Sequence, residues 1–375
     1  MIYFDNSATS GVKPQIVINA VMDALKNYSA NPGRSGYESS IKTAEKVYNV
    51  REKVAKFFNA SDPQNVIFTL NCTHSINYVL KGVLQYGDHI VISSLEHNAV
   101  LRPLTKMKAS YTIANVSHTD DNVTFENFKK SIKPNTKMIF CTGASNVTGK
   151  ILPLEKIGKL CREKGILFGV DAAQLAGVKN IDVKRMNIDF LCVAPHKGLY
   201  APMGVGILVC EKKINNTIVE GGTGTNSLQT FQPLEMPERL ESGTVNVPAI
   251  FGIGAGIDYI NGLGTEKIYS HEMEIIGYIY EKLKNNEKVI LHTPFPKRDS
   301  FAAVIPFNLK GFKSEEVADF LNINGIAVRA GYHCAPFAHK QLGTLETGAV
   351  RVSVSAFNSK SQAEKLISVL NIKKT

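Results

Sequence analysis

The chain has 375 residues, which allows one large domain with a smaller one or two domains of middling size. Its 44% hydrophobic and 20% charged residues are typical of a globular protein, and no apolar run is as long as a membrane span. The net charge of +10 comes from scattered lysines without a long basic block. This pattern argues against nucleic-acid and membrane partners and fits an anionic ligand or an acidic partner.

The first six residues have no basic region before an apolar one, so we do not expect a signal peptide. The six cysteines form no CxxC motif and show no regular spacing. Cys141, Cys192 and Cys210 lie inside apolar runs and are expected to be core residues. This usage favours a reducing compartment, and we expect a cytoplasmic protein.

Short apolar runs alternate with amphipathic segments between residues 60 and 210. The runs predict strands, and the segments between them predict helices. We expect strands at 66–70, 89–93, 111–116, 138–141, 167–170, 190–193 and 206–209, and helices at 75–83, 99–107, 125–132 and 154–163. Such alternation predicts an α/β fold with a mostly parallel sheet that is covered on both faces.

Glycine-rich segments at 221–224 and 241–244 end the alternating pattern. Further helices are expected at 247–261, 268–284, 314–322 and 361–370, and further strands at 302–306 and 326–329. We therefore predict a large α/β domain over residues 15–260. A smaller α+β domain would comprise residues 1–14 and 261–375.

Polar side chains follow successive strands of the predicted sheet. They are Thr73 and His74, Glu96 to Asn98, Ser145 and Asn146, Asp171 and Gln174, and His196 and Lys197. Ligands of open α/β sheets bind at the carboxyl ends of the strands. The sequence therefore predicts that these side chains converge on one crevice.

Asp171 and Lys197 are the most informative pair at these strand ends. Pyridoxal phosphate (PLP) requires a lysine that forms a Schiff base with its aldehyde and a carboxylate that keeps its pyridine nitrogen protonated. A structural ion pair at the sheet edge is the alternative interpretation of the same two residues.

Each neighbouring polar residue also has two interpretations. Residues 71–74 open a helix, whose free N–H groups favour a phosphate, although Thr73 could be an ordinary N-cap. His97 could lie flat against the pyridine ring or be a solvated loop histidine. Gln174 could donate to the cofactor's phenolic oxygen or stabilise a turn. His196 could reach the phosphate or the substrate, or be a satisfied, half-buried histidine.

With these residues assembled, the chain resembles fold-type I PLP-dependent transferases of aminotransferase class V, and among them the cysteine desulfurases. Its short cysteine loop is similar to that of the Suf-type, or group II, enzymes. The resemblance covers nearly the whole chain. It rests on ordered motifs at 3–9, 96–98, 145–149, 170–174, 196–197, 241–244, 329–335 and 351–353.

The resemblance implies a role for each matching residue. The cofactor contacts would be the Schiff-base Lys197, the pyridinium partner Asp171, the phenolate contact Gln174, the stacking and catalytic His97, Asn146, and the phosphate ligands Thr73, His74 and His196. Thr244 would contact the phosphate from the other subunit, which implies a homodimer. Asn146, Arg329 and Arg351 would bind the substrate, and no metal is implied.

The implied activity converts L-cysteine, or L-selenocysteine, to L-alanine and leaves the sulfur as a persulfide on Cys334. A small acceptor protein would then take the sulfur, with iron–sulfur cluster assembly as one destination. A selenocysteine lyase, another class V enzyme (a C–S lyase or a transaminase) and a non-catalytic scaffold are the alternatives. Cys334 could instead be a buried structural thiol, or a metal ligand with His333 and His339, although three ligands are too few for a closed zinc site.

Two positions depart from the family pattern. Ala194-Pro195 precede His196 where the family often has a serine or threonine that binds phosphate, so one phosphate hydrogen bond is expected to be missing. Tyr332 stands where Suf-type enzymes commonly carry a histidine, which bears on the preference for sulfur over selenium substrates.

Overall fold

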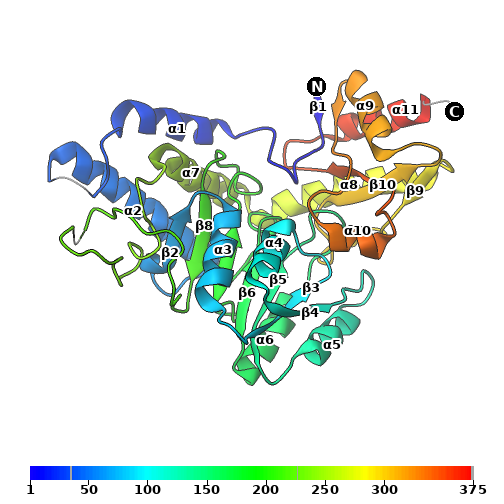
Figure 1. Cartoon of the computed structure of the whole chain (residues 1–375). Coiled ribbons are helices and arrows are strands. Elements are labelled where there is room, and N and C mark those ends of the chain that lie inside the picture. Colours follow the sequence, from blue (N-terminus) through cyan, green and yellow to red (C-terminus); the bar gives the residue numbers. More distant parts are fainter. Residues whose placement is uncertain (34–35, 226, 373–375) are drawn as a thin grey trace.

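A computed structural model describes residues 1–33, 36–225 and 227–372, and Figure 1 shows that they form a larger and a smaller lobe. A seven-stranded sheet lies at the centre of the larger lobe, in the order β2-β8-β7-β6-β5-β3-β4. Only β8 is antiparallel to its neighbours. The strands are β2 (Val66–Thr69), β3 (His89–Ser93), β4 (Ser110–Ala114), β5 (Thr136–Thr142), β6 (Leu167–Asp171), β7 (Phe190–Val193) and β8 (Gly206–Cys210).

The central strands are continuous apolar runs because helices cover both faces of the sheet. Ile90, Val91 and Ile92 of β3, for example, are all fully buried. The larger lobe also contains α1 (Gln15–Asn27), α2 (Glu38–Phe58), the short 3₁₀ helix η1 (Pro63–Asn65), α3 (Cys72–Val83), α4 (Asn98–Met107), α5 (Asp121–Ser131), α6 (Leu154–Lys164) and α7 (Val247–Leu263). The alternating strands and helices of the sequence analysis are therefore confirmed, whereas α1 and α2 were not expected.

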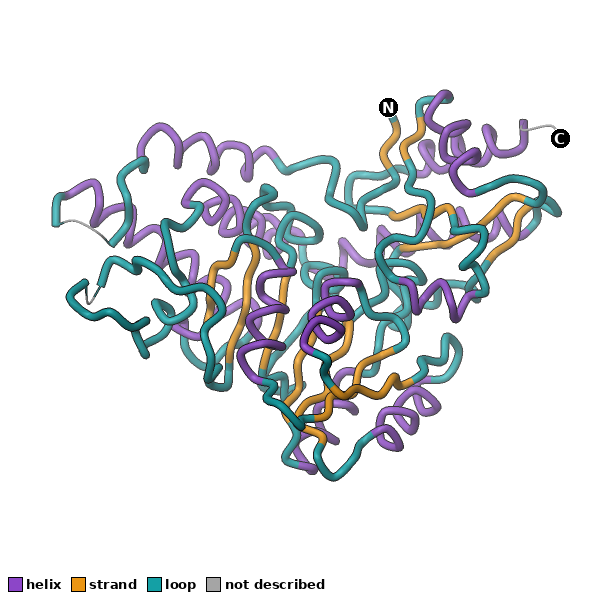
Figure 2. The backbone as a smooth tube through the Cα atoms, in the orientation of Figure 1, coloured by secondary structure: helices purple, strands orange, loops and turns teal. Residues whose placement is uncertain are grey.

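The smaller lobe is built from the end of the chain together with its first residues. It contains β1 (Ile2–Tyr3), α8 (Thr265–Lys284), β9 (Val289–Leu291), β10 (Val304–Leu309), α9 (Ser314–Ile323), β11 (Ile326–Ala327), α10 (Pro336–Leu342), β12 (Val350–Ser353) and α11 (Lys360–Ile372). The strands form an antiparallel sheet, β12-β10-β9, and a parallel pair, β1-β11. Figure 2 shows both ends of the chain on this lobe.

A separate apolar core holds the smaller lobe together. Phe4 lies in it with Ile276 of α8, Phe307 of β10 and Val352 of β12. The first residues are thus packed with the last third of the chain, as the sequence analysis expected, although the proposed boundaries at 14 and 260 stay a prediction. Within the described part of the chain, no helix is both long enough and apolar enough to span a membrane.

Candidate active site

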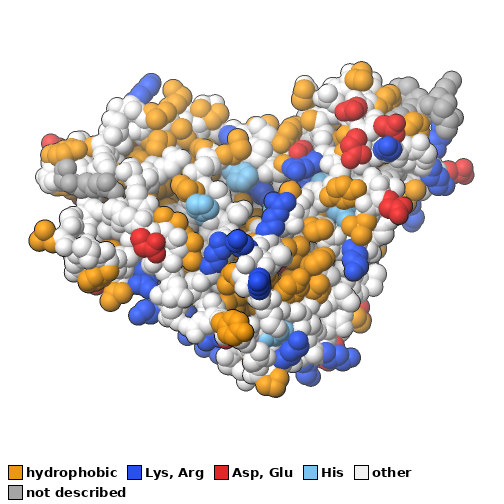
Figure 3. All heavy atoms as spheres, viewed as in Figure 1, with side chains coloured by type: hydrophobic (Ala, Val, Ile, Leu, Met, Phe, Trp, Pro, Cys, Tyr) orange, Lys and Arg blue, Asp and Glu red, His pale blue; other side chains and the backbone are white. Residues whose placement is uncertain are grey.

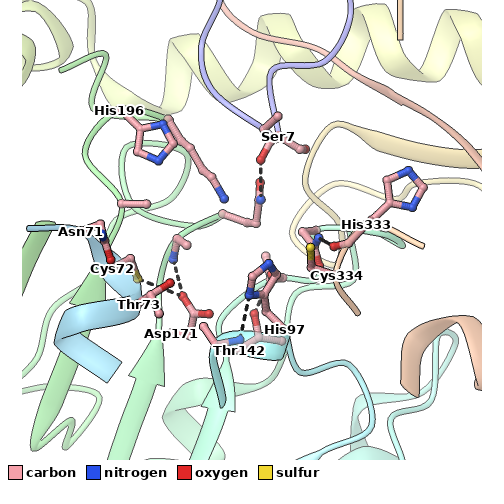
Figure 4. A pocket seen from close by; sticks show the side chains of 18 of the residues that line it. Ser7, Asn71, Cys72, Thr73, His97, Thr142, Asp171, His196, His333 and Cys334 are labelled. Carbon is pink, nitrogen blue, oxygen red and sulfur yellow. Dashed lines mark hydrogen bonds between the residues drawn. The ribbon is translucent and has the colours of Figure 1, made fainter. Parts of the chain in front are cut away.

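A cavity of about 230 Å³ lies between the two lobes, at the carboxyl ends of parallel strands β2, β3, β5, β6 and β7 (Figure 4). The predicted site residues that line it are Thr73, His97, Asn146, Asp171, Gln174, His196, Lys197, Arg329, Cys334 and Arg351. Figure 3 shows basic side chains gathered around the hollow between the lobes. Of the strand-end residues expected to converge, His74, Glu96, Asn98 and Ser145 do not line the cavity, and Thr244, the expected phosphate contact of the other subunit, lies outside it as well.

Asp171 and Lys197 come from neighbouring strands. Asp171 is the last residue of β6, and Lys197 follows β7, which pairs with β6 in parallel. The Asp171 carboxylate is buried, and its Oδ1 accepts the Ala173 N–H at 2.9 Å and faces the Cys72 thiol at 3.6 Å. Burial lowers the pKa of the Lys197 amine, and the nearby Asp171 charge opposes that shift. A lysine in such surroundings is a better nucleophile than an exposed one.

The start of α3 forms one wall of the cavity. Asn71 is its N-cap, because its side chain accepts the backbone N–H of His74 at 3.0 Å. The alternative interpretation of Thr73 as the N-cap is therefore wrong, and Thr73 lies inside the first turn, facing the cavity. The His74 ring lies beside Tyr78, with 6.3 Å between the ring centroids.

His97 and His196 face the cavity as neutral rings. The Nδ1 atom of His97 accepts the backbone N–H of Ala99 at 3.0 Å, so the proton of the neutral ring belongs on Nε2. Burial lowers the pKa of His97. Burial also lowers the pKa of His196 to about 4, helped by the positive charges of Lys197 and Lys13.

The N-terminal segment closes the cavity from the side of the smaller lobe. Gln174 donates from Nε2 to the Ser7 carbonyl at 2.8 Å, and Lys13 donates to the His196 carbonyl at 2.9 Å. The Thr9 hydroxyl lies 3.1 Å from His196 Nδ1. No role was expected for Ser7, Thr9 or Lys13, although Ser7 and Thr9 belong to the motif at 3–9.

Arg351 is the most buried cation of the cavity, with only 1% of its surface exposed. Its Nη1 donates to the Asn146 carbonyl at 2.9 Å, and its Nη2 forms an ion pair with Asp5. Among the described residues its Nε has no hydrogen-bond partner. Arg329 runs beside it, since the Arg351 N–H donates to the Arg329 carbonyl at 2.7 Å.

Cys334 is exposed, whereas burial raises the pKa of core thiols such as Cys141 and Cys192. His333 and Cys334 adopt positive φ angles of 50° and 56°, a left-handed conformation that few residues other than glycine occupy. Their carbonyls are held by the larger lobe: the Asn146 side chain donates to His333 O, and the Asn98 N–H donates to Cys334 O, both at 2.7 Å. The alternative of a buried structural thiol is wrong.

Thr244, Tyr332 and Ala194 lie in different surroundings. Thr244 is exposed and lines a different pocket, within 3.4 Å of the Asn31 side chain. Tyr332 is half exposed, with its ring edge against His339, and Ala194 lines the cavity. No group of three or more His, Cys, Asp or Glu side chains in the described ranges is arranged to hold a metal ion.

A sequence profile of aminotransferase class-V proteins matches residues 2–366. The chain belongs to this family. Probable cysteine desulfurases from Pyrococcus abyssi and Borreliella burgdorferi are 34% and 33% identical to it, over 99% and 100% of this chain and 93% and 91% of theirs. Among solved structures, an apo cysteine desulfurase from Thermococcus onnurineus superposes with a TM-score of 0.89 at 32% identity, covering 98% of this chain and 93% of that one. An S-sulfonic acid form of an Escherichia coli cysteine desulfurase gives 0.86 at 26% identity, with 98% and 93% coverage.

The cavity of this class-V protein carries groups that match each functional part of PLP, the usual cofactor of the family. The Lys197 amine matches the aldehyde, and the buried Asp171 carboxylate matches the pyridine nitrogen. The first turn of α3 and the neighbouring His196 match the phosphate, because helix N-termini attract anions. These side chains fit the cofactor.

Proposed function

We propose that this class-V protein is a PLP-dependent cysteine desulfurase, which converts L-cysteine to L-alanine and passes the sulfur through Cys334. The observation that carries the proposal is the exposed Cys334 thiol in the same cavity as Lys197 and Asp171. A transaminase has no use for a nucleophilic cysteine there, and a lyase that eliminates sulfide needs none. Curated relatives that share this chain's full length carry the same activity in their names.

The larger lobe holds the cofactor and handles the substrate's Cα proton. When bound, PLP supplies an electron sink that stabilises negative charge on the substrate's Cα. Lys197 would hold the aldehyde of the bound cofactor, and its Nζ would accept the Cα proton of the substrate. Its lowered pKa suits this role, because a neutral amine is needed. Asp171 would keep the pyridine nitrogen protonated, and His97 and Gln174, which line the same cavity, would hold the ring and its phenolic oxygen.

The smaller lobe orients the substrate. Arg351 binds the carboxylate, because a guanidinium offers two parallel N–H donors to a carboxylate. Its position is set by Asp5 and by the Asn146 carbonyl before the substrate arrives. Arg329 lies beside it and contributes a second positive charge. Such positioning aligns the Cα–H bond with the acceptor amine.

Cys334 takes the sulfur in a step that needs no external oxidant. The Cβ–S bond of L-cysteine breaks, an S–S bond forms to Cys334 Sγ, and Cβ gains hydrogen to become the methyl group of alanine. One thiol of the substrate and one of the enzyme thus become one persulfide. The loop is held at both carbonyls, so an acceptor must come to the cavity to collect the sulfur.

We also propose a homodimer and a small sulfur-acceptor protein as partners. Thr244 lies outside this chain's own cavity, as expected of a residue that serves the site of a second copy. Helix α1 exposes four apolar side chains that a second copy would cover: Ile16, Ile18, Met22 and Leu25. All six cysteines are free thiols, which suits the reducing cytoplasm.

The experiment is to measure alanine from L-cysteine with the wild-type protein and with Cys334→Ala. The variant should keep the visible absorbance band of the bound cofactor and lose alanine formation. If Cys334→Ala forms alanine at the wild-type rate, the proposal that Cys334 accepts the sulfur as a persulfide is wrong. Cys72→Ala is the matched control, because its half-buried thiol lies in the same cavity but faces Asp171. A parallel assay with L-selenocysteine tests the selenocysteine lyase alternative.

A further inference from the structure

Two buried histidines lie behind the cysteine loop, outside the roles assigned so far. His333 and His339 stack with their rings nearly parallel, at 10° and 5.3 Å between centroids. His333 Nδ1 and His339 Nε2 are 3.1 Å apart, and His339 Nδ1 lies 2.7 Å from the Thr344 hydroxyl. All three side chains are buried, with 4% or less of their surface exposed. Figure 4 shows that the His333 ring points away from the centre of the cavity.

The donor and acceptor of each hydrogen bond among His333, His339 and Thr344 follow from the contact of His333 with the Arg329 carbonyl. His333 Nε2 faces the carbonyl of Arg329 at 3.4 Å, and a carbonyl can only accept, so the His333 proton belongs on Nε2. His333 Nδ1 must then accept from His339 Nε2–H. His339 Nδ1 in turn must accept from the Thr344 hydroxyl. The result is a one-way hydrogen-bond chain from Thr344 to the Arg329 carbonyl.

The surroundings keep both rings uncharged. His333 faces the cations Arg351 and Arg329, and His339 faces His292 and the edge of Tyr332. Burial, aided by these neighbours, lowers the pKa of His333 to about 2 and that of His339 to about 4. A neutral His333 has both nitrogens occupied by the chain, so it has no free nitrogen for the Cys334 thiol.

The hydrogen-bond chain links the two ends of the cysteine loop. It joins residue 333 back to residue 329, and it ties both to α10 and to the turn that carries Thr344. The left-handed conformations of His333 and Cys334 persist only where neighbouring contacts impose them. On the open side the contacts come from Asn146 and Asn98, and on the buried side they come from the histidine chain.

We propose that His339 and Thr344 are positioning residues, which hold the loop so that the Cys334 sulfur faces the cavity at the distance that sulfur transfer requires. The proposal rests on the proposed desulfurase function and adds to it two residues that touch neither substrate nor cofactor. Because the hydrogen bonds run in one direction, the residue at position 339 must donate a hydrogen bond to His333. The residue at position 344 must in turn donate a hydrogen bond to residue 339.

The test uses paired variants. His339→Leu and Thr344→Val remove a donor, whereas His339→Gln and Thr344→Ser keep one. Thr347→Val is the matched control, because this exposed threonine lies in the same turn and its hydroxyl donates to the neighbouring Gly348 carbonyl. Hydrogen exchange of the peptide that spans residues 330–335 reports the loop directly, with or without cofactor. Alanine formation and the change in the visible band on adding L-cysteine separate sulfur transfer from substrate binding.

In the two donor-removing variants we expect the loop amides to exchange hydrogen about tenfold faster and alanine to form about tenfold more slowly. These changes correspond to the loss of roughly one hydrogen bond. The band change should persist, and the donor-keeping variants and Thr347→Val should behave as wild type. Wild-type exchange and rate in His339→Leu and Thr344→Val would overturn the proposal.

If the His339→Leu variant does not fold, the result for Thr344→Val decides between the outcomes. Faster exchange over the whole smaller lobe of Thr344→Val, and not only in the loop, would also overturn the positioning proposal. A wild-type protein that makes no alanine would refute the desulfurase function, while loop exchange would still decide the positioning role.

Discussion

The two halves of the active site are built in different ways. On the cofactor side, side chains leave consecutive strands of one sheet, so Asp171 and Lys197 are fixed by the ladder that pairs β6 with β7. On the nucleophile side, Arg351 lies on β12 of the smaller sheet, whereas Cys334 lies in a loop whose carbonyls are held by hydrogen bonds from the larger lobe. The cofactor side owes its geometry to one sheet, and the nucleophile side combines a strand of a second sheet with a loop that individual contacts hold.

This difference implies different sensitivity to substitution. A change on the cofactor side should remove a chemical function and leave the geometry of the site in place. A change on the nucleophile side should leave the functional groups present but displaced. Asn146 joins the two, because its side chain holds the His333 carbonyl and its own carbonyl holds Arg351.

The largest effect is expected for Lys197→Ala, which removes the amine that holds the aldehyde and takes the Cα proton. Alanine formation should fall on the order of 10³-fold or more, as for the loss of a general base. Borohydride reduction followed by peptide mapping should label the wild-type protein at position 197 and leave the variant unlabelled. A label on another lysine of the wild-type protein would contradict the assignment. Lys13→Ala is the control, because Lys13 is also partly buried near His196.

A smaller effect is expected for Asn146→Ala, which breaks the link between the halves. Losing one hydrogen bond to the His333 carbonyl should slow alanine formation about 3- to 10-fold. Asn98→Ala is the matched control, because Asn98 holds the Cys334 carbonyl through its backbone N–H and keeps that bond. If Asn146 instead acts only on the substrate, KM for L-cysteine should rise while the exchange rate of the loop amides stays at its wild-type value.

The smallest effect on catalysis is expected for Glu96→Gln, on the cofactor side. Glu96 is fully buried, and burial raises the pKa of its carboxyl group to about 8, against hydrogen bonds from Ser93 and the Thr142 N–H. Its Oε2 has no partner among the described residues, as suits a protonated acid. The folded protein therefore keeps a proton that the unfolded chain loses above a pH of about 4.5.

The sign of the pH dependence follows from this difference in bound protons. The contribution of Glu96 to stability is complete below pH 4.5 and is lost as the pH rises toward 8, by at most about 1.4 kcal/mol per pH unit. The free energy of unfolding, measured with urea, should decrease less steeply between pH 5 and pH 8 for Glu96→Gln than for the wild type. The same change at the exposed Glu346 should leave the slope as it is, and an unchanged slope in Glu96→Gln would show that the buried acid is already ionised.

The cofactor side could be predicted from the sequence because strand ends that follow one another in an α/β chain share one edge of the sheet. The contacts of Arg351 and Cys334 could not, because a hydrogen-bond partner 346 residues away, such as Asp5, leaves no local pattern. His339 was considered only as a metal ligand, although its ring lies on His333. Helix α1 precedes the alternating strands and helices and was not predicted, and its exposed face carries the apolar side chains Ile16, Ile18, Met22 and Leu25.

The pairing of β1 with β11 has a consequence for how the protein is made. At a synthesis rate of about 5 to 20 residues per second, Asp5 is added to the chain roughly 20 to 70 s before its partner Arg351. During that interval the nascent chain can assemble the strands that carry the lysine and the aspartate, while its first residues wait without their partners. The strands that carry Asp171 and Lys197 are therefore synthesised long before the cysteine loop and Arg351, so the thiol joins the cavity only when the polypeptide is nearly complete.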